Sequence, residues 1–437
     1  MAELKDRRFS GALATPAQIE TERRALRLFQ APEIAAIRNT LAAELRADPA
    51  ASIPDGLSTL EGSLDQWVMT LILWELNGDT ARPELLLSVD DTPRAWFGHV
   101  MPGAAAAGDN PDHIYRNAFL DGASSYEIEG RMPLFGPTQL AFEIYRCSPG
   151  DTPMATQTRA TPDLGNQVAL ITSDQMQIGP DGRFTVTIGQ QAGPVPANHL
   201  HLADGAMTLA ARDMLSDWRQ EPVPLSIRRT GGPEAGPPLT DEVVAARVTA
   251  HLPDFVRFWS GFKNNWLGGL SDNEVVSPRP RAGGWGSLAA GRFNLAEDEV
   301  FIIETTDGGA PYTGIQLNNL WMVMHAEATA GMVSINTAQA ARNPDGSFTY
   351  AVARRDPGIA NWIDTQGLAQ GIVILRWQAV PAGADPAVLL TGTRLVRRAA
   401  LDAALKPGVP RVSAEARRAQ VAQRAADYER RFGRVIG

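Results

Sequence analysis

The residues best suited to chemistry lie in one polar loop and in the apolar run that follows it. Asn361, Trp362 and Asp364 belong to the loop, and Arg376 stands near the end of the apolar run. A carboxylate can act as a general acid or base, and a guanidinium can hold a ligand oxygen. We therefore predict Asp364 and Arg376 as catalytic residues facing one cavity, with Asn361 and Trp362 as binding residues. The structural alternative is a self-capped loop whose Trp362 fills the core, because such polar residues also bond to their own backbone.

Further polar and aromatic residues are predicted to bind the same ligand. Asn110-Pro111-Asp112 followed by Tyr115 has the hydroxyl and amide groups that suit a sugar or another hydroxyl-bearing ligand. The complete set of additional binding residues is Asp112, Tyr115, Tyr312, Asn318, Trp321 and Asn336.

A second group of charged residues lies close by in the sequence. Asp112 and His113 precede Glu127 and Glu129, and these two glutamates would share one face of a strand. Paired carboxylates could serve glycoside chemistry if a spaced partner lay opposite. The simpler interpretation is that they are solvated charges on an outer face.

His199 and His201 form the only metal-binding alternative that we weigh. Alternate residues of a strand share a face, so both imidazoles could bind one divalent ion, as in a cupin-like metal-dependent enzyme. The cupin motif requires a glutamate four or five residues later, where this chain has Gly205 and Ala206. We therefore favour no metal site and expect no cofactor.

Two segments of the chain repeat each other. Residues 179–186 read Gly-Pro-Asp-Gly-Arg-Phe-Thr-Val, and residues 343–350 read Asn-Pro-Asp-Gly-Ser-Phe-Thr-Tyr. A repeat in one register indicates two homologous β-rich domains in tandem. The matched residues are Asp181 with Asp345 and Phe184 with Phe348, each 164 apart, and Asn198 with Asn361, 163 apart.

Hydrophobic periodicity predicts the elements around this repeat. Thr15-Pro16-Ala17-Gln18 is a capping box, and Ser58 to Glu61 is a second helix start. From about residue 84 the period is two, which indicates strands, including single strands over 94–100 and 313–324. The expected organisation is a helical segment over 1–80, a first β-sandwich over 81–230, a connecting helix over 239–268, a second β-sandwich over 269–400 and a final helix over 411–434.

These patterns together predict a mostly β protein, α+β overall. Strands in runs joined by hairpins favour antiparallel sandwiches over a parallel sheet with crossover helices. The expectation is two tandem jelly-roll-like β-sandwich domains, with helical additions at the N-terminus, between the copies and at the C-terminus.

The second copy also carries motifs of a known family. Asp356-Pro-Gly-Ile-Ala-Asn-Trp-Ile-Asp-Thr-Gln-Gly367, the Leu317-to-Trp321 run and the Ser334-Ile-Asn336 run resemble the domain-of-unknown-function family numbered 1214. The resemblance covers about residues 290–380, and the first β domain is more loosely similar to the companion family 1254. It implies tandem jelly-roll-like sandwiches, often in homo-oligomers, and no agreed reaction. Many members carry a histidine where this chain has Leu368.

Composition excludes several classes of function. The 437 residues carry 40 Lys and Arg against 49 Asp and Glu, so a basic nucleic-acid-binding face is not expected. Cys147 is the only cysteine, which rules out an internal disulfide and is consistent with a reducing compartment. No apolar run approaches the roughly 20 residues that cross a bilayer. We expect a cytoplasmic protein without membrane or nucleic-acid partners.

The sequence therefore predicts binding of a small organic molecule, such as a sugar, terpenoid, steroid or aromatic compound, between the two β domains. Transformation of that ligand would use metal-free acid–base chemistry, namely hydrolysis, elimination or isomerisation. The alternative is a non-catalytic jelly-roll protein that binds or assembles into a homo-oligomer. The residues alone do not decide between enzyme and binding protein.

Overall fold

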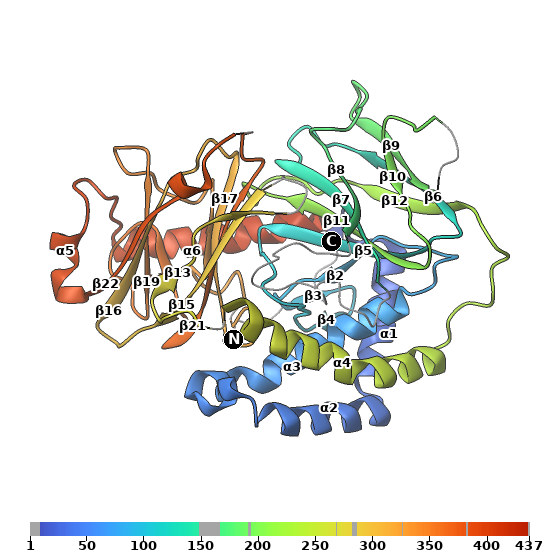
Figure 1. Cartoon of the computed structure of the whole chain (residues 1–437), viewed down its shortest axis with the longest axis horizontal. Coiled ribbons are helices and arrows are strands. Elements are labelled where there is room, and N and C mark those ends of the chain that lie inside the picture. Colours follow the sequence, from blue (N-terminus) through green and yellow to red (C-terminus); the bar gives the residue numbers. More distant parts are fainter. Residues whose placement is uncertain are drawn as a thin grey trace.

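The chain folds into two β-rich units beside a group of helices (Figure 1). The computed structural model describes residues 9–147, 167–190, 194–267, 269–281, 286–325, 327–381 and 383–435. The helices are α1 (Pro16–Phe29), α2 (Pro32–Leu45), α3 (Pro54–Leu76), α4 (Asp241–Leu267), α5 (Leu401–Ala404) and α6 (Ala414–Glu429), with 3-10 turns η1 (Pro49–Ser52), η3 (Pro386–Val388), η4 (Arg398–Ala400) and η5 (Arg430–Phe432).

The first unit contains strands β2 to β12. They are β2 (Leu86–Val89), β3 (Arg94–Trp96), β4 (His99–Met101), β5 (His113–Asp121), β6 (Ser125–Arg131), β7 (Gln139–Tyr145), β8 (Gln167–Thr172), β9 (Arg183–Gly189), β10 (His199–His201), β11 (Ala206–Met214) and β12 (Leu225–Gly231). One sheet has the order β10-β9-β6-β12 and the other the order β2-β5-β11-β7-β8, while β3 and β4 form a separate hairpin.

The second unit repeats this strand order. Its strands are β13 (Glu274–Val275), β14 (Arg279–Pro280), β15 (Gly286–Asn294), β16 (Glu299–Thr305), β17 (Tyr312–Asn318), β18 (Ser334–Asn336), β19 (Phe348–Ala353), β20 (Trp362–Asp364), β21 (Gln370–Gln378) and β22 (Leu390–Arg397). The sheets run β20-β19-β16-β22 and β13-β15-β21-β17-β18, with β14 added beside β15. The pairs β9–β10 and β19–β20 are both parallel, and the remaining pairs within these sheets are antiparallel. The short strands β1 (Phe9–Ser10) and β23 (Arg434–Val435) join the two ends of the chain.

The repeated segments occupy matching places in the two units. Asn198 precedes β10, and its side chain bonds to both backbone groups of Gln177 and to the carbonyl of Thr185. Asn361 precedes β20 and makes the same bonds to Ala341 and Thr349. The asparagine therefore clamps the entry to a parallel strand in each unit.

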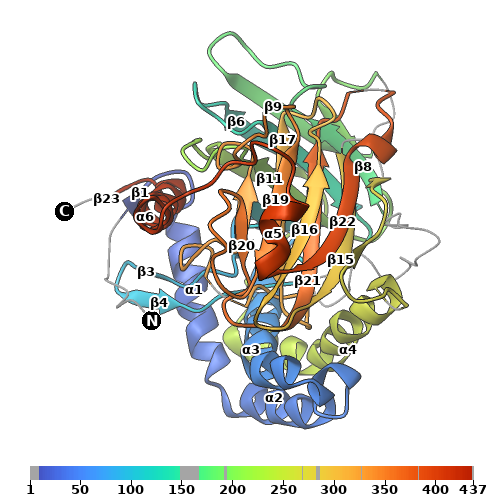
Figure 2. The same ribbon diagram turned by 90° about the vertical axis from the view of Figure 1, so that its left-hand side faces the viewer.

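The three largest apolar clusters of the described residues hold these layers together. One fills the space between the sheets of the first unit, and a second fills the corresponding space in the second unit. The third surrounds α3 and reaches Phe119 on β5 and Ile374 on β21. Helix α3 therefore packs against the large sheets of both units, with α4 beside it and α2 below it (Figure 2). This arrangement turns the outer faces of the two large sheets toward a shared interior.

The mostly β, α+β composition is confirmed, but several local predictions are wrong. Helix α3 begins at Pro54 and Ser58 lies inside it, because proline occupies the first turn there. Residues 94–100 do not form one strand, since Phe97 and Gly98 adopt φ of +50° and +82° and turn the chain between β3 and β4. The strand from residue 312 ends at Asn318, and the next asparagine caps a turn.

Other local predictions are confirmed. The Thr15 side chain accepts a hydrogen bond from the backbone N–H of Gln18, with Pro16 in the first helical turn. The final helix, α6, has Ser413 as its N-cap, and Tyr428 of α6 and Phe432 of the following η5 are buried in a cluster with residues of both units. Within the described ranges, no helix combines the length and apolarity that spanning a bilayer requires.

Candidate functional site

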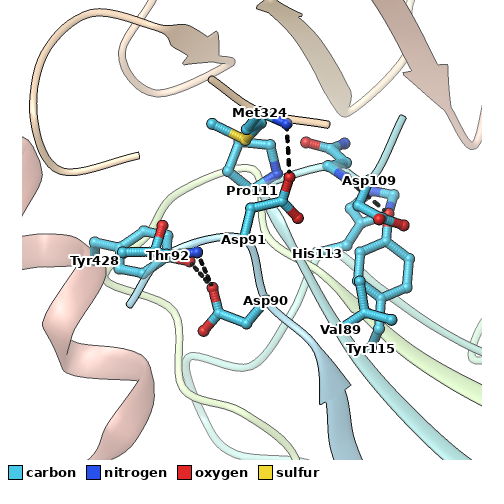
Figure 3. Close-up of a pocket in the computed structure, with 11 residues that line it drawn as sticks. Val89, Asp90, Asp91, Thr92, Asp109, Pro111, His113, Tyr115, Met324 and Tyr428 are labelled. Carbon is cyan, nitrogen blue, oxygen red and sulfur yellow. Dashed lines mark hydrogen bonds between the residues drawn. The ribbon is translucent and has the colours of Figure 1, made fainter. Parts of the chain in front are cut away.

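A small buried pocket lies where the two units meet (Figure 3). It encloses about 10 Å³, which is room for roughly one water molecule. Its walls come from the end of β2, the loop before β5 and the start of β5, and Met324 and Tyr428 complete it from the second unit and α6. The lining residues that can exchange protons or donate hydrogen bonds are Asp90, Asp91, Thr92, Asp109, Asn110, His113, Tyr115 and Tyr428.

The loop before β5 places the acidic and aromatic groups of this pocket. The Asn110 side chain accepts the backbone N–H of Asp112, and the Asn110 backbone carbonyl accepts the N–H of His113, so the chain turns sharply into β5. Residues of β5 then alternate between faces. Ala118 and Leu120 enter the core of the first unit, so His113 and Tyr115 point toward the second unit.

Asp91 and Asp109 form an acid pair in the pocket. Burial raises the pKa of Asp91 well above its usual range, and the nearby charge of Asp109 raises it further. Burial also raises the pKa of Asp109, to about 6, although the N–H of Ala106 and the charges of Arg376 and Arg212 oppose the shift. These shifts favour the protonated form of Asp91 beside Asp109, and two carboxyl groups with different proton affinities suit acid–base chemistry.

His113 is a buried neutral imidazole. Burial lowers its pKa well below the usual value, and the positive charges of Arg376, Arg212, Arg281 and Arg431 lower it further. Its ring lies 5.6 Å from that of Tyr115 and 5.6 Å from that of Tyr312, centre to centre. Its Nε2 has no hydrogen-bond partner within the part of the chain that the structure describes. A buried nitrogen in that state can form a hydrogen bond with a ligand.

Three arginines surround the same centre. Arg212 on β11 pairs with Glu143 at 3.0 Å, and its guanidinium lies 5.4 Å from the centre of the Tyr115 ring. Arg376 on β21 donates to the side chain of Gln316 and to the carbonyl of Gly108. Burial, followed by the charge of Arg212, lowers the pKa of Arg281 to about 10. We call the acid pair, His113, Tyr115 and these three arginines the inter-sheet site.

Asp112 binds the two units together at the edge of the inter-sheet site. It is fully buried and accepts hydrogen bonds from the Tyr312 hydroxyl at 2.8 Å, from the Trp218 indole at 2.7 Å and from Asn336 at 3.2 Å. Burial raises its pKa. Four predicted binding residues, Asp112, Tyr115, Tyr312 and Asn336, are thus brought together from both units.

The predicted catalytic residues do not share a cavity. Arg376 lies between Leu375 and Trp377, which enter the core of the second unit, so its side chain points out of that unit. Asp364 lies on β20 in the other sheet, lines a separate pocket with His325, and accepts the backbone N–H of Gln366. Asp364 therefore caps its own loop, with burial raising its pKa.

The other predicted residues of this region have structural contacts. Asn361 clamps β20, and the Trp362 indole donates to the carbonyl of Ala353. Trp321 donates to the carbonyl of Gly56 in α3. Asn318 lines the pocket of Asp364 and donates to the carbonyl of Met322. The structural interpretation of the Asn361–Asp364 loop therefore fits its geometry better than the functional one.

The histidine and glutamate alternatives also lie away from the inter-sheet site. His199 Nδ1 contacts the Thr187 hydroxyl at 2.9 Å, and its Nε2 contacts the carbonyl of Gly189 at 3.2 Å. Glu127 pairs with Arg228 on the neighbouring strand, and Glu129 is exposed. Across the described ranges, no cluster of three or more His, Cys, Asp or Glu side chains is arranged to hold a metal ion.

Sequence reasoning missed Asp91, Asp109, Arg212 and Gln316. One signal could have found Arg212, because its offset from Arg376 equals the offset that relates Asp181 to Asp345. Asp91 and Asp109 carry no comparable signal, because only the tertiary structure brings the end of β2 beside the loop before β5.

Comparisons with known proteins support the fold alone. Neither a protein-family model nor a curated protein matches the chain. The crystal structure of an uncharacterized protein from Burkholderia cenocepacia is similar, with a TM-score of 0.65 and 23% identity over 86% of this chain and 99% of that one. A protein from Vibrio parahaemolyticus aligns over 66% of this chain and 89% of its own, with 13% identity and a TM-score of 0.37, too low to support an argument.

Proposed function

We propose that this protein binds a small organic molecule at the inter-sheet site, whose pocket widens on binding from its present room for about one water molecule, and that any transformation of that molecule uses acid–base chemistry by Asp91, Asp109 and His113. The observation that carries the proposal is that an acid pair and a neutral histidine line one buried pocket between two sheets, with the charges of Arg212 and Arg376 near enough to lower the pKa of Asp109 and of His113. Perturbed titratable groups that converge in a cavity are typical of functional sites.

The different proton affinities of Asp91 and Asp109 support chemical transformation of the ligand as well as its binding. The raised pKa of Asp91 favours its protonated form, whereas Asp109, with a pKa of about 6, can accept a proton near neutral pH. An acid and a base held together can protonate one atom of a ligand while deprotonating another, as hydrolysis, elimination and isomerisation require. The proposal also includes two tandem jelly-roll-like sandwiches and the resemblance of residues 290–380 to the family numbered 1214. It includes no nucleic-acid and no membrane partner.

Ligand-observed NMR with a mixed library of neutral, cationic and anionic small molecules tests the binding. We expect binders whose signal falls at least about tenfold in His113→Gln and in Tyr115→Phe. His199→Gln is the matched control, because it makes the same substitution at a histidine of β10, in a different sheet, and should leave binding unchanged. Binders that keep their affinity in His113→Gln, or a library without any binder, would overturn the proposal.

Conversion of the bound molecule is tested separately. Mass spectrometry after incubation should reveal a product whose formation is lost in Asp109→Asn while binding is retained. Binding without a product in the wild type would instead support the competing function, a non-catalytic binding or assembly protein. Tyr428 of α6 and Phe432 of η5 are buried in the protein's own core, so these two residues are not available as a surface for such an assembly.

A further inference from the structure

The pocket between the two units has the size and the lining of a buried water site. Its free space is about 10 Å³, which admits roughly one water molecule. Asp91, Asp109 and His113 all line it (Figure 3). A buried water needs about two to four polar partners, whereas cavities that stay dry are apolar. A polar pocket of this size is therefore suited to hold one water molecule.

His113 offers the first partner. Its Nδ1 lies 3.4 Å from the hydroxyl of Tyr115. That hydroxyl accepts the backbone N–H of Asn110 at 3.0 Å and can donate its own proton to the imidazole. With Nδ1 as an acceptor, the proton of the neutral ring lies on Nε2. His113 is 3% exposed, and its Nε2 has no hydrogen-bond partner among the described residues, so this N–H requires an acceptor.

The acid pair offers the other partners. Asp91 accepts the backbone N–H of Met324 at 2.9 Å, and Asp109 accepts that of Ala106 at 2.6 Å. A carboxyl group has about four acceptor positions on its two oxygens, so each acid keeps capacity for a further hydrogen bond. The raised pKa of Asp91 also favours a protonated carboxyl group, which can donate to a water oxygen.

We infer that one water molecule resides in this pocket, where it accepts the Nε2 proton of His113 and forms hydrogen bonds with the carboxyl groups of Asp91 and Asp109. The presence of the water depends on the geometry alone, and its chemical role rests on the proposed function. Within the described part of the chain, no direct hydrogen bond joins the two acids. The water is the link between them. Asp91 gives its proton to the water oxygen while the water gives one of its own protons to Asp109, and His113 positions the water.

Val89 provides variants that change the space without removing a polar partner. It lines the pocket from β2 and is 5% exposed. Val89→Ile adds a methylene group that takes up space that the water needs. Val89→Thr keeps the size of the side chain and is the matched control. Crystal structures that resolve ordered water are determined for the wild type and both variants, and urea unfolding verifies that both variants fold.

We expect one water peak in the wild type and in Val89→Thr, about 2.7–3.2 Å from His113 Nε2 and from a carboxyl oxygen of Asp91 or Asp109. The peak should be absent in Val89→Ile. An empty pocket in the wild type, or an unchanged peak in Val89→Ile, would overturn the inference. So would a cation in the wild-type pocket, recognised by contacts shorter than hydrogen bonds.

A second measurement does not depend on crystals. NMR of ¹⁵N-histidine-labelled protein should show magnetisation transfer from water to the Nε2 proton of His113 in the wild type and in Val89→Thr. The transfer should be lost in Val89→Ile. A wild-type His113 that carries its proton on Nδ1 would contradict the proposed hydrogen bond to the water.

These tests separate the water from the proposed function, because neither uses an organic ligand. Water in the pocket, together with a library that contains no binder, would uphold this inference and overturn only the proposed function. Binders that depend on His113, together with an empty wild-type pocket, would uphold the proposed function and overturn only this inference.

Discussion

The hydroxyl of Tyr312 donates a 2.8 Å hydrogen bond to the carboxylate of Asp112, which lies 200 residues earlier in the chain. Tyr312 begins β17 of the second unit, and Asp112 directly precedes β5 of the first. The same hydroxyl accepts from Asn110 at 2.6 Å, so one phenol joins the second unit to the loop that presents His113. Stability and site geometry therefore depend on the same contact.

Tyr312→Phe should lower the free energy of unfolding by about 1–3 kcal/mol, because it leaves the buried Asp112 and Asn110 with fewer partners. Urea unfolding measures the change. In a double-mutant cycle with Asp112→Asn, the two losses should couple by about 0.5–3 kcal/mol. Simple additivity of the two changes would show that the bond does not hold the units together.

Asp109→Asn should change how stability depends on pH. The pKa of Asp109 is raised to about 6 from a usual 3.8, so folding favours its protonated form. The contribution of this raised pKa to the free energy of unfolding is fully present below about pH 4. It is lost as the pH rises to about 6, which lowers the free energy of unfolding by up to about 3 kcal/mol.

The wild type minus Asp109→Asn difference in unfolding free energy should therefore fall across pH 4 to 6 and be flat above it. The hydrogen bond from the N–H of Ala106 can be kept by the asparagine oxygen, which makes the comparison a fair one. A difference that does not vary with pH would contradict the raised pKa.

His113 should remain neutral at pH values where an ordinary histidine is protonated. Burial and the charges of Arg376, Arg212, Arg281 and Arg431 lower its pKa in the folded protein. The unfolded chain therefore gains a proton at this residue below about pH 6.5 while the native ring stays neutral, and stability falls as the pH drops below that value. NMR of ¹⁵N-histidine-labelled protein, assigned by comparison with His113→Gln, should show a neutral ring at pH 6. An imidazolium spectrum at that pH would refute the burial of this ring against arginines.

Glu22→Gln should destabilise the protein by about 3–5 kcal/mol at neutral pH, because it breaks a buried charge pair. Glu22 accepts hydrogen bonds from Trp96 at 2.6 Å and from His99 at 2.7 Å, and it pairs with Arg94. Although burial opposes ionisation, Arg94 and these hydrogen bonds lower the pKa of Glu22 to about 2.

The lowered pKa of Glu22 contributes to the free energy of unfolding above pH 4.5, and this contribution is lost as the pH falls toward 2. The gap between wild type and Glu22→Gln in urea unfolding should therefore narrow over that interval. A gap of constant size would show that Glu22 acts by its shape and not by its charge.

Asp364→Asn should leave ligand binding at the inter-sheet site unchanged. Its carboxylate accepts from the backbone and side chain of Gln366, so the variant should lose about 1 kcal/mol of stability. Calorimetry with the ligands found by NMR measures the binding, and urea unfolding measures the stability. Loss of binding in a fully folded variant would restore Asp364 as a site residue.

Local patterns were enough to predict much of the architecture. The equal offsets that relate Asp181 to Asp345 and Phe184 to Phe348 indicated repeated β-rich units, and the strands around these residues occupy the same place in the sheet order. Thr15 was predicted as a cap, and its hydrogen bond depends on a residue within one helical turn. Such features can be predicted because the residues that cause them lie close together in the chain, or because two segments of the sequence repeat each other.

Which residues lie together in the candidate site could not be predicted from the sequence in the same way. Asp364 and Arg376 belong to consecutive strands of the chain, β20 and β21, yet these strands lie in different sheets and only Asp364 lines the pocket with His325. Arg212 and Arg376 belong to different units, yet both surround His113. Alternation along a strand predicts that neighbours point to opposite faces, but not which face meets another sheet.

By itself, the sequence determined the repeat, the mostly β composition and the residues that cap turns and helices. Only the tertiary structure decided that the outer faces of two sheets meet, and that Asp91, Asp109, His113 and the arginines share one buried point. The physical reason is that short-range patterns depend on backbone geometry, whereas the site depends on how α3 and the two sheets pack, a contact set by apolar surfaces far apart in the chain.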